Sequence, residues 1–297
     1  MAVYSIKDIE KITGIKAHTI RIWERRYGLV IPKRTDTNIR YYSDDDLKDI
    51  LNISILNQNG LKISKIAKLT KKEVRAKVNS LIESPKEFEN IIDKMLLSMI
   101  EVDESSFLET FSDSWQLYGF EEMIESIFFP FLERLGILWQ TGTIKPAQER
   151  FISNLLRQKI IVAIDNEMFD EKADKDKIIF FLPENELHEI SLLFYSFIAR
   201  EMGYEVIYLG ASIPIKDLIE VQRVTKAKAM FSAHINSTKK KEIENMFVYF
   251  NETFPTMYFY VTGLQIKDLK PALPPNFFVI PNSNTFKEEL LKLSDYN

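Results

Sequence analysis

The alternation of apolar and polar positions over the first thirty residues predicts two short helices joined by a turn. In the first helix the apolar residues share one face, at Ile6, Ile9 and Ile12. Ser5 and Asp8 have the spacing of a capping box, which marks the start of that helix. Thr13-Gly14-Ile15 should end it, and a basic second helix is expected over residues 16–27. Two helices around a turn with glycine, the second one basic, are the geometry with which proteins read the major groove of DNA.

Two short strands around a polar tip are predicted after the second helix. They cover residues 30–34 and 39–42, on either side of Thr35-Asp36-Thr37-Asn38. Such a hairpin can lie along a phosphate backbone beside the groove that the helix enters. The side chains that would contact the phosphates are Lys33, Arg34 and Arg40.

A third helix is predicted after the hairpin, where Ser43 precedes Asp46 at capping-box spacing. Its apolar stripe consists of Leu47, Ile50, Leu51 and Ile55. This helix should end at Gly60, and Ser64 should start a shorter one. Residues 1–78 therefore form the first predicted domain.

Helical periodicity dominates the chain from about Glu83 to Phe169. The first of these helices carries its apolar residues at helical spacing, at Phe88, Ile91, Ile92, Met95, Leu96, Met99 and Ile100. Three more are expected over residues 103–118, 121–138 and 146–168. Pro130 lies inside the third helix and predicts a kink there. Four helices with short connections predict a four-helix bundle, assigned to residues 79–172.

Beyond Asp174 strands and helices alternate. Strands are predicted over residues 178–182, 205–209, 229–233, 256–261 and 277–280, and helices over 188–202, 214–225 and 238–254. This order predicts a flavodoxin-like, doubly wound α/β domain with a parallel sheet over residues 173–297. Ligands of such domains bind at the carboxyl ends of the strands, here the loops after Leu182, Leu209, Ala233 and Val261.

Charge separates the first domain from the rest of the chain. Residues 1–80 hold 17 Lys and Arg against 9 Asp and Glu, whereas the remainder holds 22 against 34. A basic head on an acidic body fits a DNA-binding sensor. The lysines between Lys62 and Lys72 have a second reading, because they could simply solvate helix faces. The chain has no cysteine and three histidines, and its lack of a leader or long apolar run predicts a soluble cytoplasmic protein.

The first quarter of the chain resembles the MerR family of winged-helix regulators. The ordered identities are Thr13-Gly14-Ile15, Thr19-Ile20-Arg21, Trp23-Glu24, Arg26-Tyr27-Gly28-Leu29, Pro32, Arg34, Arg40, Tyr42 and Asp46. The chain departs from the pattern at Thr37-Asn38, where the family often has Asn-Gly. The resemblance implies a homodimer or homotetramer that binds a repeated double-stranded operator.

Within this head, individual side chains can be assigned to parts of the DNA. Ile20 and Trp23 should face the core, together with Tyr27. Base edges should be read by His18, Thr19 and Arg21. Phosphates should be contacted by Arg25, Arg26, Lys33, Arg34 and Arg40, and the DNA-binding set also includes Lys16 and Tyr42.

The order of the three domains resembles that of the light- or cobalamin-responsive MerR-type regulators of carotenoid genes. In that family the α/β domain is similar to the cobalamin-binding domain of methionine synthase. Its signature is (D/E)-x-H-x-x-G after the first strand, S-x-(L/T/V) after the third and G-G after the fourth. The resemblance implies that the histidine is the lower axial ligand of cobalt and that the small residues leave room for the nucleotide tail. The implied cofactor is adenosylcobalamin or another cobalamin.

The present chain keeps only part of this signature. Glu186 and His188 are retained, so that the acid could orient the imidazole and His188 would be the metal ligand. Ser191 replaces the glycine, Ser232 is kept but is followed by His234, and Gly263 is preceded by Thr262. Of the helical motif W-x9-E-H, Trp139 and Glu149 remain, although both could be ordinary bundle residues. Arg150 replaces the second histidine, and a guanidinium has no lone pair to offer a metal.

Three functions remain open at this point. The first is a transcriptional regulator with a cobalamin-binding sensory module. The second is the same regulator with a degenerate cobalamin site that senses another ligand or a protein partner. The third, a corrinoid carrier in methyl transfer, is disfavoured because a carrier needs no groove reader. The sequence contains no phosphate loop, thiol or paired catalytic carboxylates in a motif, so we do not expect an enzyme.

Overall fold

The computed structural model describes residues 3–35, 38–58, 60–79, 87–140, 144–166, 176–236 and 239–295. The chain divides into two compact units, residues 1–152 and 153–297, which are described separately. The predicted domain boundary at residues 172–173 lies outside the described residues. Within the described ranges, no helix is both long and apolar enough to span a lipid bilayer.

The first unit begins with the predicted helix pair. Strand β1 (Val3–Ser5) leads into α1 (Ile6–Thr13), whose capping box is formed as predicted: the Asp8 amide donates to Ser5 Oγ and the Ser5 amide to Asp8 Oδ2. Gly14 ends α1 in the left-handed region at a φ of 68°. The second helix is α2 (Ala17–Ile22), continued by a π-helical turn, η1 (Trp23–Tyr27).

A small antiparallel sheet follows, in the order β1-β3-β2. The predicted hairpin is formed by β2 (Lys33–Arg34), which is shorter than expected, and β3 (Arg40–Ser43), which is shifted by one residue from its predicted bounds; β1 pairs with β3 on its other side. Part of the tip, residues 36–37, lies outside the described residues. Ser43 then caps α3 (Asp44–Gln58) through Asp46, as predicted. The shorter helices α4 (Ile63–Ile66) and α5 (Lys71–Asn79) complete this part.

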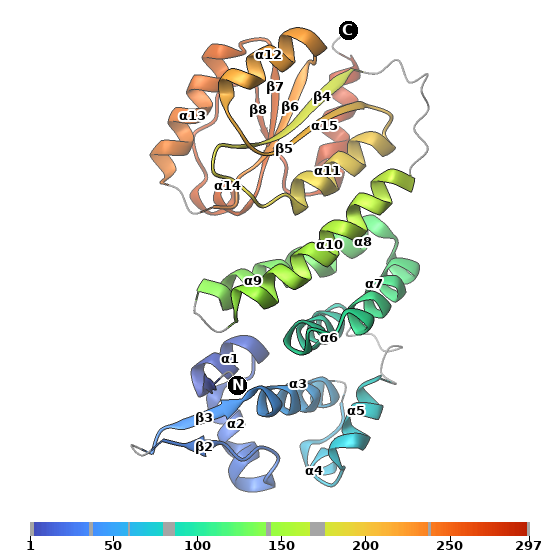
Figure 1. Ribbon diagram of the computed structural model, residues 1–297, viewed down its shortest axis with the longest axis vertical. Helices are drawn as coiled ribbons and strands as arrows, with labels where there is room; N and C mark the ends of the chain where they lie inside the picture. The colour runs from blue at the N-terminus through green and yellow to red at the C-terminus, as the bar shows by residue number, and fades with distance from the viewer. Residues whose placement is uncertain are drawn as a thin grey trace. The chain divides into compact units, whose positions relative to one another are not determined.

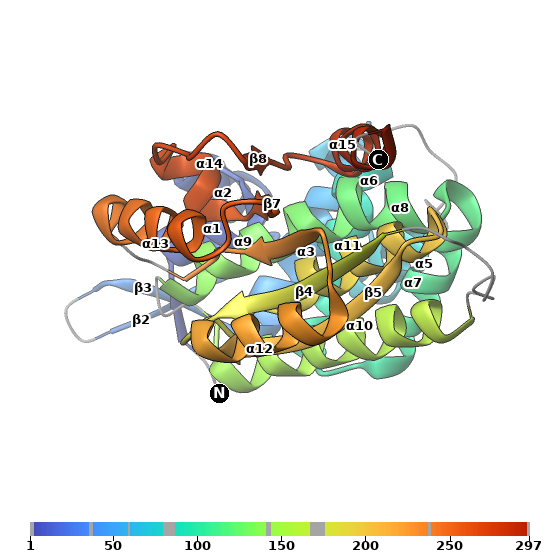
Figure 2. The same cartoon turned by 90° about the horizontal axis from the view of Figure 1, so that it is seen from above.

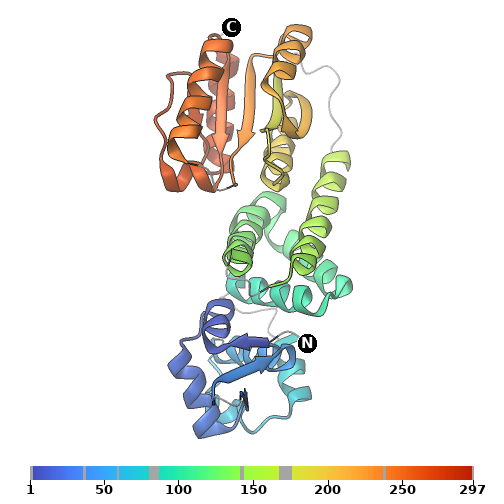
Figure 3. The same ribbon diagram turned by 60° about the vertical axis from the view of Figure 1, so that its left-hand side comes forward.

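The helical segments predicted after residue 83 are present. They are α6 (Glu87–Glu101), α7 (Glu104–Tyr118), α8 (Phe120–Met123), η2 (Ile124–Phe128), α9 (Phe129–Gln140) and α10 (Pro146–Asn166), drawn in shades of green in Figure 3. The third predicted helix is thus interrupted by the π-helical turn η2, immediately before Pro130. Proline lacks an N–H and its ring crowds the carbonyl four residues earlier, so a regular helix is disfavoured there.

The second unit contains a five-stranded parallel sheet in the order β5-β4-β6-β7-β8. Its strands are β4 (Lys177–Pro183), β5 (Glu205–Ile213), β6 (Ala229–Ala233), β7 (Tyr258–Thr262) and β8 (Phe277–Val279). Numbered within the domain this order is 2-1-3-4-5, which is the flavodoxin-like arrangement. The predicted α/β class is therefore confirmed.

Helices cover both faces of this sheet (Figures 1 and 2). One face carries α11 (Ile190–Glu201) and α15 (Ser283–Asp295), and the other carries α12 (Ile215–Thr225), α13 (Lys240–Thr253) and the short α14 (Leu264–Leu269). Neither α14 nor α15 was predicted. Aromatic rings fill both interfaces: Phe181 packs edge-on against Phe250 of α13, whereas Phe231 contacts Phe286 of α15.

Candidate functional site

The second helix presents its polar side chains to solvent. Ile20 and Trp23 are buried, as predicted, and anchor the helix in the head. Thr19 is half-buried, while the remaining polar residues of the predicted DNA-binding set on this helix are exposed: Lys16, His18, Arg21, Arg25 and Arg26. Gly28, in the left-handed region at a φ of 62°, ends the π-helical turn. The helix therefore offers a continuous basic edge.

A buried carboxylate ties this helix to the hairpin. Glu24 in the π-helical turn accepts a hydrogen bond from Arg40 Nε at 2.9 Å, and Arg34 Nη2 lies 3.7 Å from its other oxygen. Arg34 also donates to Asn38 Oδ1 at 2.7 Å. The Glu24 side chain is only 15% exposed. Two of the predicted phosphate ligands are thus held in place by one glutamate, a role that the sequence analysis did not assign.

The hairpin places its remaining candidates on opposite faces. Lys33 is exposed, and it pairs with Tyr41 across the hairpin. Tyr42, on the other face, is fully buried, and its hydroxyl lacks a hydrogen-bond partner among the residues that the structure describes. Its inclusion among the DNA-binding residues was therefore wrong, because a side chain in the core of the head cannot reach DNA. Tyr42 shares its face of β3 with Arg40, and on this face Arg40 itself is bound to Glu24.

In the second unit, Glu186 and His188 are brought together as the sequence suggested. Both follow β4, and His188 Nδ1 lies 2.6 Å from Glu186 Oε1. A carboxylate is an acceptor, so Nδ1 carries the proton, and any metal would be bound through Nε2. The imidazole is 56% exposed, whereas the Glu186 side chain is 6% exposed. An oriented imidazole on a solvent-facing loop is suited to act as an axial metal ligand.

Glu186 also joins two loops at the carboxyl edge of the sheet. Its Oε2 accepts hydrogen bonds from the backbone amides of Ile235 and Asn236 in the loop after β6, at 2.8 and 2.7 Å. Burial alone would raise the pKa of Glu186, but the hydrogen bonds from the His188 side chain and from three backbone amides lower it to about 2. The carboxylate therefore stays ionised and keeps the His188 loop attached to the loop after β6.

The residue after His188 makes a second connection. Glu189 Oε2 accepts from Arg157 Nε of α10 at 3.2 Å, and Glu189 Oε1 accepts from the Tyr208 hydroxyl of β5 at 3.2 Å. Burial and the neighbouring Glu189 carboxylate raise the pKa of Tyr208, so its hydroxyl remains a donor. The loop that carries His188 is thus held by α10 as well as by the sheet. Neither Arg157 nor Tyr208 was predicted, since no motif links them to the loop.

Where the signature has small residues, the space is largely filled by the protein's own side chains and backbone. Ser232 Oγ lies 3.0 Å from His234 Nε2, and both side chains are buried. Burial lowers the pKa of His234 to about 4, so its imidazole is neutral, and its ring packs edge-on against Phe247. By contrast, the buried Ser191 hydroxyl has no hydrogen-bond partner within the described part of the chain.

Gly263 is required for a local reason. A Cβ built there would lie 2.4 Å from the His234 carbonyl oxygen, and its φ of 109° is strained for any other residue. The space that the glycine opens is used by the backbone of His234, whose amide also donates to the Thr262 carbonyl. The Thr262 hydroxyl donates to Ile280. This glycine therefore lets two strand ends close together, which differs from the room for a nucleotide tail that the resemblance implied.

The candidate residues of the helical motif belong to the first unit. Trp139 near the end of α9 is 55% exposed, Glu149 in the first turn of α10 is half-buried, and Arg150 is exposed. An indole exposed to this extent does not contribute to a core.

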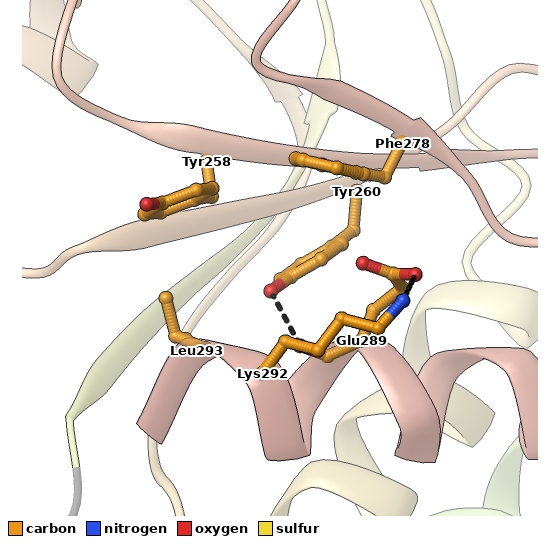
Figure 4. Close-up of a pocket in the computed structure, with 6 residues that line it drawn as sticks. All are labelled: Tyr258, Tyr260, Phe278, Glu289, Lys292 and Leu293. Carbon is orange, nitrogen blue, oxygen red and sulfur yellow. Dashed lines mark hydrogen bonds and ion pairs between the residues drawn. The ribbon is translucent and has the colours of Figure 1, made fainter. Parts of the chain in front are cut away.

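A further cavity lies away from all these residues. It holds about 190 Å³ between β7, β8 and α15, and its lining includes the paired side chains of Glu289 and Lys292 (Figure 4). Tyr260 donates to the Glu289 carbonyl at its floor. None of the predicted cofactor residues lines it.

Two family models match this chain, one over the DNA-binding head and one over the helical segment that follows it. Residues 4–73 match the MerR HTH family regulatory proteins, over the segment that contains the basic helix and the hairpin. Residues 91–163 match the family described as the B12 binding domain, which spans α6 to α10. The chain is a DNA-binding transcriptional regulator with a MerR-type head. It combines this DNA-binding head with a B12-binding-type domain.

Curated relatives of this regulator are named as HTH-type transcriptional repressors or regulators. The HTH-type transcriptional repressor CarH of Myxococcus xanthus is 27% identical over 72% of the chain and 73% of its own length. The repressor CarA of the same organism is 25% identical over 70% of the chain and 68% of its length. The regulator MlrA of Escherichia coli is 38% identical, but over only 25% of the chain. All three relatives are named as transcriptional regulators or repressors.

A solved structure supports the fold described for the helical segment and the α/β domain. The monomethylamine corrinoid protein of Methanosarcina barkeri superposes with a TM-score of 0.53 at 13% identity, covering 69% of the chain and 99% of that protein. At this identity the likeness concerns the fold alone. A helical segment followed by a parallel α/β domain is thus an architecture shared with a corrinoid protein.

Proposed function

We propose that this regulator binds a cobalamin through His188 and that the bound cofactor changes its affinity for operator DNA. The observation that supports the cofactor most directly is the Glu186–His188 pair, at 2.6 Å on an exposed loop. Glu186 would keep the imidazole in the tautomer whose Nε2 faces outward, and the other bonds of Glu186 would hold the loop in place. When bound, cobalamin would supply a cobalt ion, which the His188 imidazole would hold.

Three further features support this assignment. Trp139 presents an exposed indole, which could cover an apolar ring system. The buried Ser191 hydroxyl could satisfy a polar group of the ligand. Arg157 and Tyr208 hold Glu189 beside the ligand histidine, so that α10 would respond to a movement of the loop. Glu149, Ser232 and Gly263 remain candidates for the cofactor site by resemblance only.

The DNA-binding side of the proposal rests on the exposed basic edge of the second helix. His18, Thr19 and Arg21 would read base edges, while Lys16, Arg25, Arg26, Lys33, Arg34 and Arg40 would contact phosphates, with β2–β3 acting as the wing. A homodimer or homotetramer would occupy the repeated half-sites of a double-stranded operator. A cofactor could change this assembly only by binding one of its states more tightly.

The cofactor proposal is tested by an absorbance spectrum. The purified protein is incubated in the dark with adenosylcobalamin and separated from free ligand by gel filtration. We expect a corrinoid spectrum that is retained by the wild type and by His18→Ala, and lost by His188→Ala. Loss of the spectrum from all three proteins would refute a cobalamin site.

A second candidate is a regulator with a degenerate cobalamin site that senses another ligand or a protein partner. One observation favours it: the Ser232 hydroxyl is already bonded to the buried His234, and the backbone of His234 closes the space at Gly263. A colourless protein that still binds DNA would support this candidate.

A further inference from the structure

Arg134 of α9 contacts two other helices of the first unit. Its Nη1 donates to Asp93 Oδ1 of α6 at 2.8 Å, and its Nη2 donates to the backbone carbonyl of Ile12 in α1. The first contact stays within the B12-binding-type segment, whereas the second reaches the DNA-binding head, 122 residues away in the sequence. A single guanidinium therefore joins the two functional parts of this unit.

The Ile12 carbonyl, which accepts this bond in the head, lies next to the turn between α1 and α2. Ile12 is in the last turn of α1, where carbonyls have no partner within the helix and carry the negative end of its dipole. Gly14 follows in the left-handed region, and α2 begins three residues later. The Thr13 hydroxyl also receives the Ile15 amide within this turn. Anything that holds the Ile12 carbonyl therefore holds the turn from which the basic helix starts.

In the helical segment, Asp93 fixes the position of the Arg134 guanidinium. The Asp93 side chain is 3% exposed, and the Arg134 side chain is 25% exposed. A buried carboxylate requires a charged or hydrogen-bonding partner, and Arg134 provides it. The planar guanidinium can present two nitrogens to two acceptors at once, which a single ammonium group on a flexible stem cannot do in the same geometry.

A second ion pair crosses between the same two parts. Lys48 of α3 lies 3.4 Å from Glu101 at the end of α6, and its ammonium is also 3.7 Å from Asp45. This pair is more exposed than that of Arg134, with Glu101 37% exposed, so it should contribute less to the attachment. The Arg134 contacts are thus the more buried of these two links.

We propose that Arg134 is a positioning residue for DNA recognition: it holds the end of α1 on α6 and α9, and so couples the placement of α2 to the packing of the B12-binding-type segment. This inference rests on the proposed function, because it requires α2 to read DNA. A change in the packing of α6 against α9 would be transmitted to α2 through the Ile12 carbonyl. The bonds of Arg134 are the physical contact on which that coupling depends.

The first test compares Arg134→Lys with wild type. Lysine keeps a positive charge beside Asp93, so the buried carboxylate is not left alone, but the bond to the Ile12 carbonyl is weakened. Duplexes enriched from a random pool by the wild-type protein serve as the specific DNA, and a scrambled duplex serves as the non-specific one. We expect specific affinity to fall about tenfold. Non-specific affinity and its salt dependence should be unchanged, since no phosphate contact is removed.

A second measurement needs no DNA. Amide hydrogen exchange over residues 13–20 should become faster in Arg134→Lys and in Arg134→Met, with little change in α3. Asp93→Asn, which leaves Arg134 able to bind the Ile12 carbonyl, should change this exchange less than Arg134→Met does. Arg223→Lys alters an exposed ion pair in α12 and is the matched control, with wild-type exchange and affinity.

The results of these two tests distinguish a failure of the Arg134 proposal from a failure of the proposed function. Folded Arg134 variants with wild-type exchange over residues 13–20 and wild-type specific affinity would overturn it. A loss of global stability with no selective change in residues 13–20 would also overturn it, because Arg134 would then be a packing residue only. If the wild type enriches no specific DNA, the DNA-binding proposal fails, and the exchange measurement still decides whether Arg134 holds the turn.

Discussion

Arg40 of the hairpin donates from Nε to the Glu24 carboxylate of the π-helical turn, at 2.9 Å. The helix that should enter the major groove and the strand that should follow the phosphate backbone are therefore held together by one hydrogen-bonded ion pair. Lys33, exposed on the other face of the hairpin, is not part of this link. Replacing Arg40 and replacing Lys33 should therefore have different effects on the protein.

Replacing Lys33 with alanine should weaken DNA binding without affecting the fold. Each phosphate contact that is lost reduces the slope of log affinity against log salt by about one. We expect that reduction in Lys33→Ala, for specific and non-specific duplexes alike, with an unchanged thermal midpoint. Fluorescence anisotropy at several salt concentrations measures the slope. An unchanged slope would remove Lys33 from the phosphate-contacting set.

Arg40→Ala should reduce the same slope and also destabilise the head. Without Arg40, the buried Glu24 carboxylate keeps only the longer contact from Arg34. We expect a loss of about 1 kcal/mol in the free energy of unfolding. Unfolding of the first unit can be followed by tryptophan fluorescence, because all three tryptophans lie in it. Equal stabilities of Arg40→Ala and Lys33→Ala would show that the Glu24 bond contributes nothing.

Glu186→Gln should destabilise the α/β domain and release the His188 loop. Its hydrogen bonds lower the pKa of Glu186 from about 4.5 to about 2, which corresponds to about 3 kcal/mol in favour of the folded state. Because the folded-state pKa is the lower one, this stabilisation is present above pH 4.5 and is lost as the pH falls through 2.

The measurement is urea unfolding at pH 7, followed by circular dichroism. Glu184→Gln is the matched control, since Glu184 lies two residues earlier and is exposed. If both variants unfold at the same urea concentration as wild type, the network around Glu186 does not stabilise the domain.

His234 should make the α/β domain less stable in mild acid. Burial lowers its pKa from 6.5 to about 4, so the unfolded chain takes up a proton that the folded chain does not. The free energy of unfolding therefore falls as the pH decreases from 6.5 towards 4. Between pH 7 and pH 5 the loss should be about 2 kcal/mol.

His234→Leu should remove this pH dependence, and the exposed His18→Gln should keep it. Unfolding by urea at pH 7 and pH 5 compares the three proteins. An identical pH dependence in wild type and His234→Leu would mean that another group causes it. The leucine variant also removes the bond to Ser232, so increased cobalamin retention in it would support a site that His234 obstructs.

The sequence was sufficient to predict the features that depend on local patterns. The capping boxes at Ser5 and Ser43 and the strands of the parallel sheet follow from residue spacing, and all are present, whereas the kink at Pro130 stays a prediction. The Glu186–His188 pair was predicted from the resemblance to the (D/E)-x-H signature, whose spacing lets the acid orient the imidazole.

Other features depend on contacts between distant residues, which spacing does not encode. Arg134 reaches Ile12 and Arg157 reaches Glu189 only after folding. The backbone of His234 occupies the space beside Gly263 because two parallel strands end together there. The sequence left Tyr42 undecided between the core and a DNA contact and included it in the DNA-binding set, whereas its side chain is fully buried in the folded head.

The central claim, that His188 coordinates the cobalt of a bound cobalamin, is tested most directly by electron paramagnetic resonance. Protein labelled with ¹⁵N-histidine is loaded with cob(II)alamin, whose unpaired electron lies along the axial direction. We expect each cobalt line to be split into a doublet by the labelled nitrogen, and this pattern to be absent in His188→Ala. A triplet in the labelled wild type, arising from the unlabelled nucleotide base, or the absence of any bound cobalamin signal, would contradict the claim.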